Sequence, residues 1–131
     1  MIFKSVQNYK WERKTVLVVE DDPATIFFLK EILSNTGITI LIAETGESAI
    51  SICKKNKNID IVLMDMNLPG IDGYEATREI KKKCTNLPVI AQTAYALIED
   101  LEKCKNCGCD GYVAKPINIF ELLAKMDILL I

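Results

Sequence analysis

The chain has 131 residues, the length of one domain with a single hydrophobic core. Half of the residues are hydrophobic and 26% are charged, which excludes disordered, collagen-like and mucin-like chains. The net charge of -2, without a basic block, argues against nucleic-acid binding, which depends on neutralising phosphates. The sequence contains no histidine, so Ser/His triads, histidine-ligated metals and a phosphohistidine made on this chain are excluded.

No stretch approaches the roughly 18 apolar residues of a membrane-spanning helix, and residues 1–14 mix charged and apolar side chains, unlike a signal peptide. We therefore expect a cytoplasmic location and no membrane contact by this domain. Five cysteines without an export signal favour reduced thiols over a disulfide framework. Residues 1–14 are interpreted as an N-terminal lead or linker, and residues 15–131 as the folded domain.

Apolar runs alternate with segments of helical periodicity along the chain. Asp22 and Pro23 are typical of an N-cap and the first turn that follows it, and Asn118 is expected to cap a last helix. The Pro and two Gly of residues 67–73 indicate a loop. The expected strands are residues 15–19, 38–43, 59–64, 88–92 and 111–114. The expected helices before the last one are residues 24–35, 46–55, 74–84 and 96–106.

This alternation predicts an α/β fold, because parallel strands need crossover connections and near-continuous apolar strands are buried on both faces. We expect a doubly wound, five-stranded parallel sheet in the flavodoxin-like order 2-1-3-4-5, with five helices. A closed barrel needs more strand and helix units than the chain contains.

Polar side chains follow several of the expected strands, where open parallel sheets bind their ligands. These residues are Glu20, Asp21, Asp22, Asp65, Thr93 and Lys115. Carboxylates that converge repel one another unless a proton or cation compensates, and oxygen ligands favour a hard cation such as Mg²⁺. A carboxylate nucleophile beside a lysine and a hydroxyl is suited to phosphoryl transfer.

Four blocks carry a family resemblance: VLVVEDD at residues 16–22, MDMNLPGIDGYEATR at 64–78, QTA at 92–94 and GYVAKP at 111–116. The sequence resembles the receiver domain of two-component response regulators from about Lys14 to its end. The second block looks most like receivers attached to hybrid histidine kinases. Each block alone is weak, but the four in order are highly specific.

The resemblance implies that Asp65 accepts a phosphoryl group from a phosphohistidine of a partner. Asp21 and Asp65 would bind Mg²⁺ with the backbone carbonyl of Asn67, and Glu20 would act through water. The family usually has Asp at the position of Glu20, a difference expected to alter water geometry more than competence. Asp22 fits better as the cap of the first helix than as a ligand.

The resemblance also implies a switch. Thr93 matches the hydroxyl that bonds a phosphoryl oxygen, and Tyr112 matches the aromatic residue that turns inward with it. Lys115 matches the lysine that pairs with the phosphoryl group, and its bond to Pro116 is commonly cis in the family. Such a domain is a signalling module and not an enzyme, apart from its own phosphorylation and slow dephosphorylation.

The implied partner is a histidine kinase or a histidine phosphotransfer protein, with a possible homodimer through the fourth helix, fifth strand and fifth helix. We expect either a single-domain regulator or, preferably, part of a hybrid kinase. Helical periodicity directs Ile26, Leu29, Ile32 and Leu33 to the sheet and Phe27 to solvent. Phe27 is then a candidate contact for the partner.

Three other interpretations are weaker. A phosphatase of the haloacid dehalogenase type uses a second Asp two residues after the nucleophile, where this chain has Asn67. A flavin-binding protein needs a Gly/Ser/Thr-rich phosphate loop, whereas residues 20–23 are acidic. Cys104, Cys107 and Cys109 offer three thiols, one ligand short of a structural zinc site, and are better interpreted as small, largely buried side chains.

Overall fold

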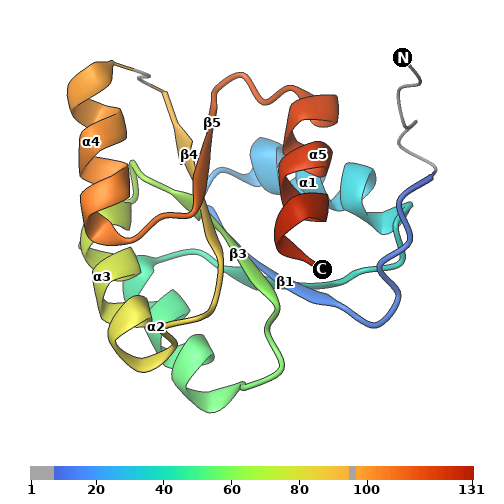
Figure 1. Cartoon of the computed structure of the whole chain (residues 1–131), viewed down its shortest axis with the longest axis horizontal. Coiled ribbons are helices and arrows are strands. Elements are labelled where there is room, and N and C mark those ends of the chain that lie inside the picture. Colours follow the sequence, from blue (N-terminus) through green and yellow to red (C-terminus); the bar gives the residue numbers. More distant parts are fainter. Residues whose placement is uncertain (1–7, 95–96) are drawn as a thin grey trace.

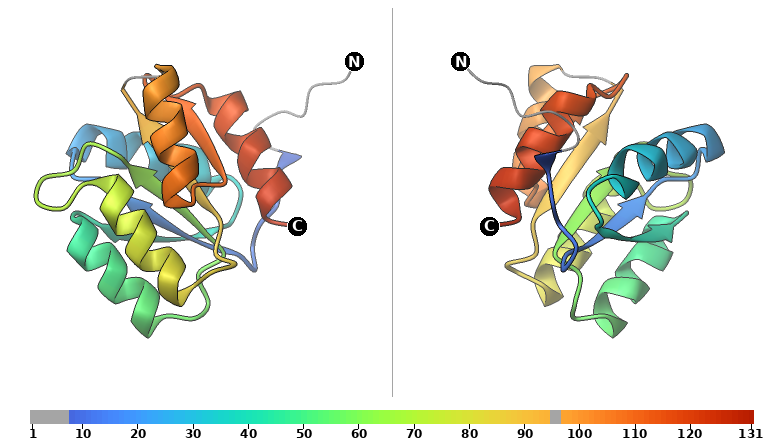
Figure 2. Two further views of the ribbon diagram at one scale, coloured as in Figure 1. Left: turned by 60° about the vertical axis from the view of Figure 1, so that its left-hand side comes forward. Right: turned by 90° about the vertical axis from the view of Figure 1, so that its right-hand side faces the viewer.

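The computed structural model describes residues 8–94 and 97–131. Its five parallel strands pair in the order β2-β1-β3-β4-β5, which confirms the predicted doubly wound sheet. The strands are β1 Thr15–Val19, β2 Thr39–Ala43, β3 Ile61–Asp65, β4 Val89–Thr93 and β5 Gly111–Ala114. The helices are α1 Pro23–Ser34, α2 Gly46–Lys55, α3 Gly73–Lys83, α4 Ile98–Cys107 and α5 Ile119–Leu129. Figures 1 and 2 show α1 and α5 on one face of the sheet and α2, α3 and α4 on the other.

Neighbouring residues of one strand belong to two different cores. Val18 packs with the core under α1 and α5, and Val19 packs with the core under α2, α3 and α4. Both side chains are fully buried, which explains why the strands lack polar alternation. Strand order reverses between β1 and β3, where Val19 pairs with Met64, so the ends of these two strands lie side by side.

Side-chain caps begin four of the helices. Each capping oxygen accepts a hydrogen bond from the backbone N–H three residues later, which satisfies one of the free donors of the first turn. The capping residues are Asp22 for α1, Thr45 for α2, Asp72 for α3 and Asn118 for α5. The predicted caps at Asp22 and Asn118 are therefore confirmed. In the described part of the chain, no helix is both long and apolar enough to cross a membrane.

Several boundaries differ from the prediction by one or two residues. β3 covers residues 61–65 and β4 covers residues 89–93, each later than the apolar run suggested. Ile59 is buried although it precedes β3, because a loop that enters the core also needs apolar side chains. Asp65 and Thr93 are consequently the last residues of their strands. α1 and α3 each begin and end one residue earlier than expected, and β2 begins at Thr39.

The fourth helix covers Ile98–Cys107 instead of residues 96–106. The expected first residue, Ala96, lies outside the described residues. The observed helix ends one residue later because Gly108, with a φ of 104°, provides the left-handed conformation that terminates it.

Tyr9 and Trp11 of the N-terminal lead pack onto the core beneath α1 and α5. Both side chains are 6% exposed, and their ring centroids are 5.2 Å apart. The Trp11 backbone N–H donates to the carbonyl of Thr36 at 2.7 Å, and its indole Nε1–H donates to Asp127 Oδ1 at 3.3 Å. The lead therefore contributes to the core, whereas the boundary after residue 14 stays a prediction.

Candidate functional site

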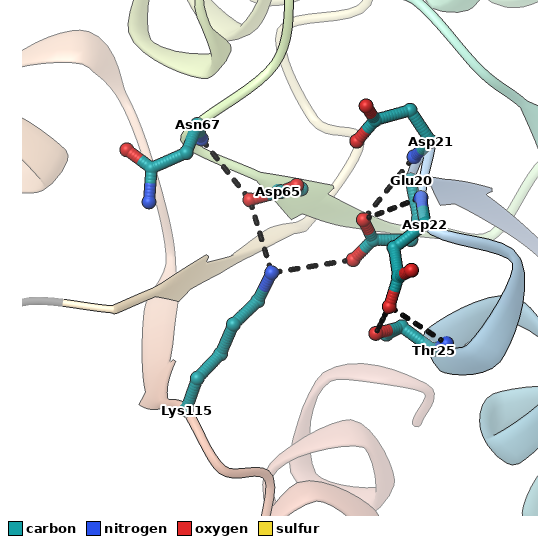
Figure 3. A network of polar contacts seen from close by, with 7 residues as sticks. All are labelled: Glu20, Asp21, Asp22, Thr25, Asp65, Asn67 and Lys115. Atoms are coloured by element: carbon teal, nitrogen blue, oxygen red, sulfur yellow. Dashed lines mark hydrogen bonds and ion pairs between the residues drawn. The ribbon is translucent and has the colours of Figure 1, made fainter.

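Glu20, directly after β1, is a buried carboxylate at the edge of the sheet. Its Oε2 accepts hydrogen bonds from the backbone N–H groups of Asp21 at 3.1 Å and Asp22 at 3.2 Å, and its Oε1 lies 3.4 Å from Lys115 Nζ (Figure 3). Burial raises the pKa of Glu20 and the charge of Asp65 adds to this effect, against the opposing Asp22 hydrogen bond and Lys115 charge. Sequence reasoning assigned Glu20 to a metal-bound water and missed its contact with Lys115.

Asp65, the last residue of β3, is also buried, with 2% of its surface exposed. Its Oδ1 accepts a hydrogen bond from the backbone N–H of Asn67 at 3.0 Å and lies 3.3 Å from Lys115 Nζ. The loop after β3 therefore contributes a backbone donor to Asp65, whereas a role for the backbone carbonyl of Asn67 as a metal ligand stays a prediction. No feature of the sequence distinguishes these two roles, because the direction of a peptide group depends on the loop.

The chain then returns to Asp65 through Gly73, the first residue of α3. The Gly73 N–H donates to the carbonyl of Met66 at 3.4 Å. A Cβ atom at position 73 would lie 2.6 Å from the carbonyl oxygen of Asp65 and 2.7 Å from the Cα of Met66. Only glycine allows this close approach, so α3 begins directly against the backbone at the end of β3.

Lys115 connects the two buried carboxylates. It follows β5, its peptide bond to Pro116 is cis, and its backbone N–H donates to the carbonyl of Thr93 at 2.8 Å. Burial lowers the pKa of the ammonium, but the charges of Asp65 and Glu20 outweigh it, so the pKa of Lys115 is raised. The lysine therefore stays charged at neutral pH.

Thr93 and Tyr112, the predicted switch residues, lie on adjacent strands but in different environments. Thr93 is 3% exposed at the end of β4, beside the site. Tyr112 is 37% exposed on β5, with Lys125 Nζ 4.7 Å from its ring centroid. The structure thus brings Thr93 to the acidic edge and leaves Tyr112 on the outer surface.

Oxygen atoms of Glu20, Asp21 and Asp65 lie within 4.8 Å of one another, close enough to hold one metal ion. Asp21 is exposed, whereas Asp22 turns away to α1, where its Oδ2 accepts hydrogen bonds from the Thr25 hydroxyl at 2.7 Å and the Thr25 backbone N–H at 3.2 Å. These bonds lower the pKa of Asp22 and confirm its capping role. Three carboxylates against one lysine leave an excess of negative charge, and an all-oxygen donor set fits Mg²⁺.

Residues 16–127 match the response regulator receiver domain family. The chain belongs to this family. Receiver domains accept a phosphoryl group on an aspartate in two-component phosphorelays, and they interact with histidine kinases or histidine phosphotransfer proteins. This receiver is 38% identical over 109 residues to a cyclic di-GMP phosphodiesterase of Thermotoga maritima. The matched region covers 83% of this chain and 28% of that protein.

The receiver is also 38% identical over 104 residues to the sensor histidine kinase RcsC of Escherichia coli strain K12, covering 79% of this chain and 11% of the kinase. It thus spans less than a third of either curated relative. Among solved structures, the receiver domain of the sensor histidine kinase PA1611 from Pseudomonas aeruginosa superposes with a TM-score of 0.82. That match has 34% identity and covers 89% of this chain and 97% of the other, whose active-site cleft coordinates a magnesium ion.

Proposed function

We propose that Asp65 accepts the phosphoryl group from a phosphohistidine of a partner protein. The observation that best supports this role is the position of the Asp65 carboxylate. It lies between Glu20 and the Asn67 N–H, with the Lys115 ammonium 3.3 Å away. Attack by the carboxylate forms a phosphorus–oxygen bond as the phosphorus–nitrogen bond of the donor breaks. The Lys115 ammonium is placed to neutralise charge on the phosphoryl oxygens.

We further propose that Asp21, Asp65 and the backbone carbonyl of Asn67 hold Mg²⁺ directly and that Glu20 holds it through water. The converging carboxylates and the magnesium ion in the PA1611 receiver support this assignment. When bound, the ion neutralises charge on the phosphoryl group during transfer. Glu20 is fixed by two backbone N–H groups, so it can orient a water molecule without moving.

We propose that phosphorylation of Asp65 changes the shape of the surface formed by α4, β5 and α5. The Thr93 hydroxyl would bond a phosphoryl oxygen, and Tyr112 would turn inward and leave Lys125. Leu97 at the start of α4, Ile98 within it and Phe120 on α5 are 60%, 75% and 61% exposed. These apolar side chains support a binding role for this surface, including a homodimer.

The domain's own chemistry is proposed to end with acceptance and slow hydrolysis of the phosphoryl group. We place it in the cytoplasm, as part of a hybrid kinase or as a single-domain regulator, with no nucleic-acid or membrane contact of its own. A haloacid dehalogenase-type phosphatase is disfavoured because Asn67, two residues after Asp65, has no acidic group to protonate a leaving group.

The test is incubation of the purified chain with a small phosphodonor and Mg²⁺, followed by mass spectrometry. We expect one acid-labile phosphate on the peptide containing Asp65 and none in Asp65→Asn. Asp72→Asn is the matched control, because asparagine also caps a helix and the phosphate should remain. The same phosphate on Asp65→Asn would overturn the assignment.

A further inference from the structure

Two thiols in the connection between α4 and β5 touch each other. Cys107 is the last residue of α4, and Cys109 lies two residues before the start of β5. Their Sγ atoms are 3.6 Å apart, and the Cys107 thiol also donates to the carbonyl of Cys104 at 3.1 Å. Gly108 between them adopts a left-handed conformation, and its N–H donates to the carbonyl of Lys105 at 3.1 Å. The helix-ending turn thus holds the two thiols in contact.

The contact makes one of the two sulfurs a nucleophile near neutral pH. The hydrogen bond from Cys109 lowers the pKa of Cys107 to about 7, despite burial, and the positive charge of Arg78 contributes. The same contact raises the pKa of Cys109. Burial raises the pKa of Cys53 to about 11, so that thiol stays protonated. The thiolate is the reactive form, which distinguishes Cys107 from Cys53.

A surface cavity opens onto Cys109, one of the two thiols. It has a volume of about 340 Å³ and lies between α4 and β5. Cys109 is part of its lining, together with Cys104 and Tyr112. Cys107 is 3% exposed and is not part of the lining, so burial shields it from large reagents, and its contact with Cys109 is its link to the cavity.

We propose that Cys107 and Cys109 are a modification site, at which a hydroperoxide such as hydrogen peroxide forms a reversible disulfide. The Cys107 thiolate attacks a peroxide oxygen, an S–O bond forms, the O–O bond breaks, and the leaving hydroxide is protonated to water. The Cys109 sulfur then attacks this sulfenic sulfur; the S–S bond forms, the S–O bond breaks, and hydroxide leaves with the Cys109 proton as a second water. The two sulfurs together lose two electrons and the peroxide gains them. A thiol reductant reverses the reaction.

The disulfide would join the end of α4 to the segment before β5. Because Tyr112 lines the same cavity, oxidation changes the surroundings of this aromatic residue on the proposed signalling surface. Asp65 takes no part in the thiol chemistry. The disulfide is therefore expected in Asp65→Asn as well, so failure of this proposal and failure of the proposed phosphoacceptor are distinguishable.

The experiment treats the reduced full chain with hydrogen peroxide, alkylates the remaining thiols and maps the peptides. Trypsin cleaves after Lys105 but not before Pro116, so residues 106–125 carry both Cys107 and Cys109, and Cys104 lies in another peptide. We expect protection of two of the five thiols and a 106–125 peptide lighter by two hydrogen atoms. Dithiothreitol should restore it, and the oxidation rate should rise as pH passes through about 7.

Two variants provide the controls, with circular dichroism to establish that each is folded. Cys109→Ser should stop at a sulfenic acid on Cys107, which dimedone traps, because the second thiol is absent. Cys104→Ser should still form the disulfide. Alkylation of all five thiols after peroxide treatment, a cross-link to the Cys104 peptide, or only disulfides between two chains would each overturn the proposal.

Discussion

Lys115 and Glu20 form an ion pair across the carboxyl edge of the sheet, with Nζ 3.4 Å from Oε1. The Glu20 side chain is 1% exposed, so its charge is compensated by Lys115 and two backbone N–H groups in place of water. Lys115 also lies 3.3 Å from Asp65 Oδ1. A cation that enters the site therefore competes with Lys115 for these two carboxylates, and a phosphoryl group on Asp65 lies next to the same ammonium.

The two exposed acids after Glu20 should behave differently when they are removed. Asp21→Ala should weaken Mg²⁺ binding by about tenfold or more, because it deletes a proposed ligand oxygen. Asp22→Ala should leave Mg²⁺ affinity unchanged but lower the urea midpoint of unfolding, because α1 loses its cap. Calorimetric titration and urea denaturation measure the two effects. An equal loss of Mg²⁺ affinity in both variants would contradict the assignment.

Glu20→Gln should become more stable than the unmodified chain as pH rises. The raised pKa of Glu20 means that the fold favours its protonated form. Its contribution to the free energy of unfolding is therefore complete below the usual glutamate range and is lost as pH rises through the folded-state pKa. Urea denaturation without Mg²⁺ from about pH 4 to pH 8 should show a growing difference.

Added Mg²⁺ should reduce that difference at neutral pH, because the cation compensates the ionised carboxylate. Glu102→Gln, which removes an exposed carboxylate from α4, is the control for the loss of a surface charge. A constant offset between Glu20→Gln and the unmodified chain across the pH range would show that burial does not govern this group.

The switch should depend on the Thr93 hydroxyl. With a beryllofluoride mimic bound at Asp65, the NMR signals of the Tyr112 ring and of Lys125 should shift, because their cation–π contact breaks. Thr93→Val should still accept phosphate but lose these shifts. Thr77→Val is a matched control, since its buried hydroxyl has no hydrogen-bond partner in the described structure. Unchanged Tyr112 signals in the unmodified chain would exclude the switch.

Phe27 should contribute to phosphotransfer from the partner protein but not to phosphorylation by a small phosphodonor. Its side chain is 67% exposed on α1, as periodicity predicted, and Phe28 is 39% exposed. Phe28 also lines an apolar cavity of about 270 Å³ that includes Lys115 and Pro116, so this surface adjoins the site. Phe27→Ala should slow phosphotransfer from the cognate phosphohistidine protein by about tenfold, the effect of a moderate interface contact.

Phosphorylation of Phe27→Ala by a small donor should remain normal. Phe120→Ala, which removes a similarly exposed aromatic from α5, is the control for the loss of apolar surface. If both variants transfer at the unmodified rate, Phe27 is an ordinary surface residue. If Phe27→Ala unfolds, the orientation assigned to α1 is wrong.

Trp11→Ala should lower the free energy of unfolding by about 3 kcal/mol, as expected for deletion of a buried aromatic side chain. Trp11→Phe should lower the free energy of unfolding by less, because phenylalanine keeps most of the packing and loses only the indole hydrogen bond to Asp127. Lys10→Ala, at an exposed neighbour, should change stability by less than about 0.5 kcal/mol. Urea denaturation followed by circular dichroism measures all three. No loss in Trp11→Ala would mean that the lead is dispensable.

Trp11 also illustrates what could not be predicted from sequence. Its buried position and that of Tyr9 were missed because isolated aromatic residues among charged ones have no helical or strand period. By contrast, the bounds of Thr15–Val19 and Gly111–Ala114 were predicted correctly, because short apolar runs are the pattern of strands covered on both faces. The strand order was predicted from the βα alternation, because such units build a doubly wound parallel sheet.

For the site, strand topology alone predicts that Asp65 and Lys115 converge. Asp65 lies at the carboxyl end of β3 and Lys115 at that of β5, and in a parallel sheet these ends lie along the same edge. The ion pair of Glu20 with Lys115 and the Asn67 N–H bond to Asp65 depend on side-chain conformers and loop direction, which no residue pattern specifies. The Cys107–Cys109 contact depends likewise on the left-handed turn at Gly108.

Because Gly73 has no side chain, the backbone of α3 lies directly against the backbone of Asp65, the proposed phosphoacceptor. A methyl group there would overlap the carbonyl oxygen of Asp65, so helix and strand backbones are in direct contact with no compressible side chain between them. A displacement of the first turn of α3 therefore has to move the peptide group of Asp65 with it. Because α4 packs against α3, strain applied by α4 can be passed through the rigid contact at Gly73 to the backbone of Asp65.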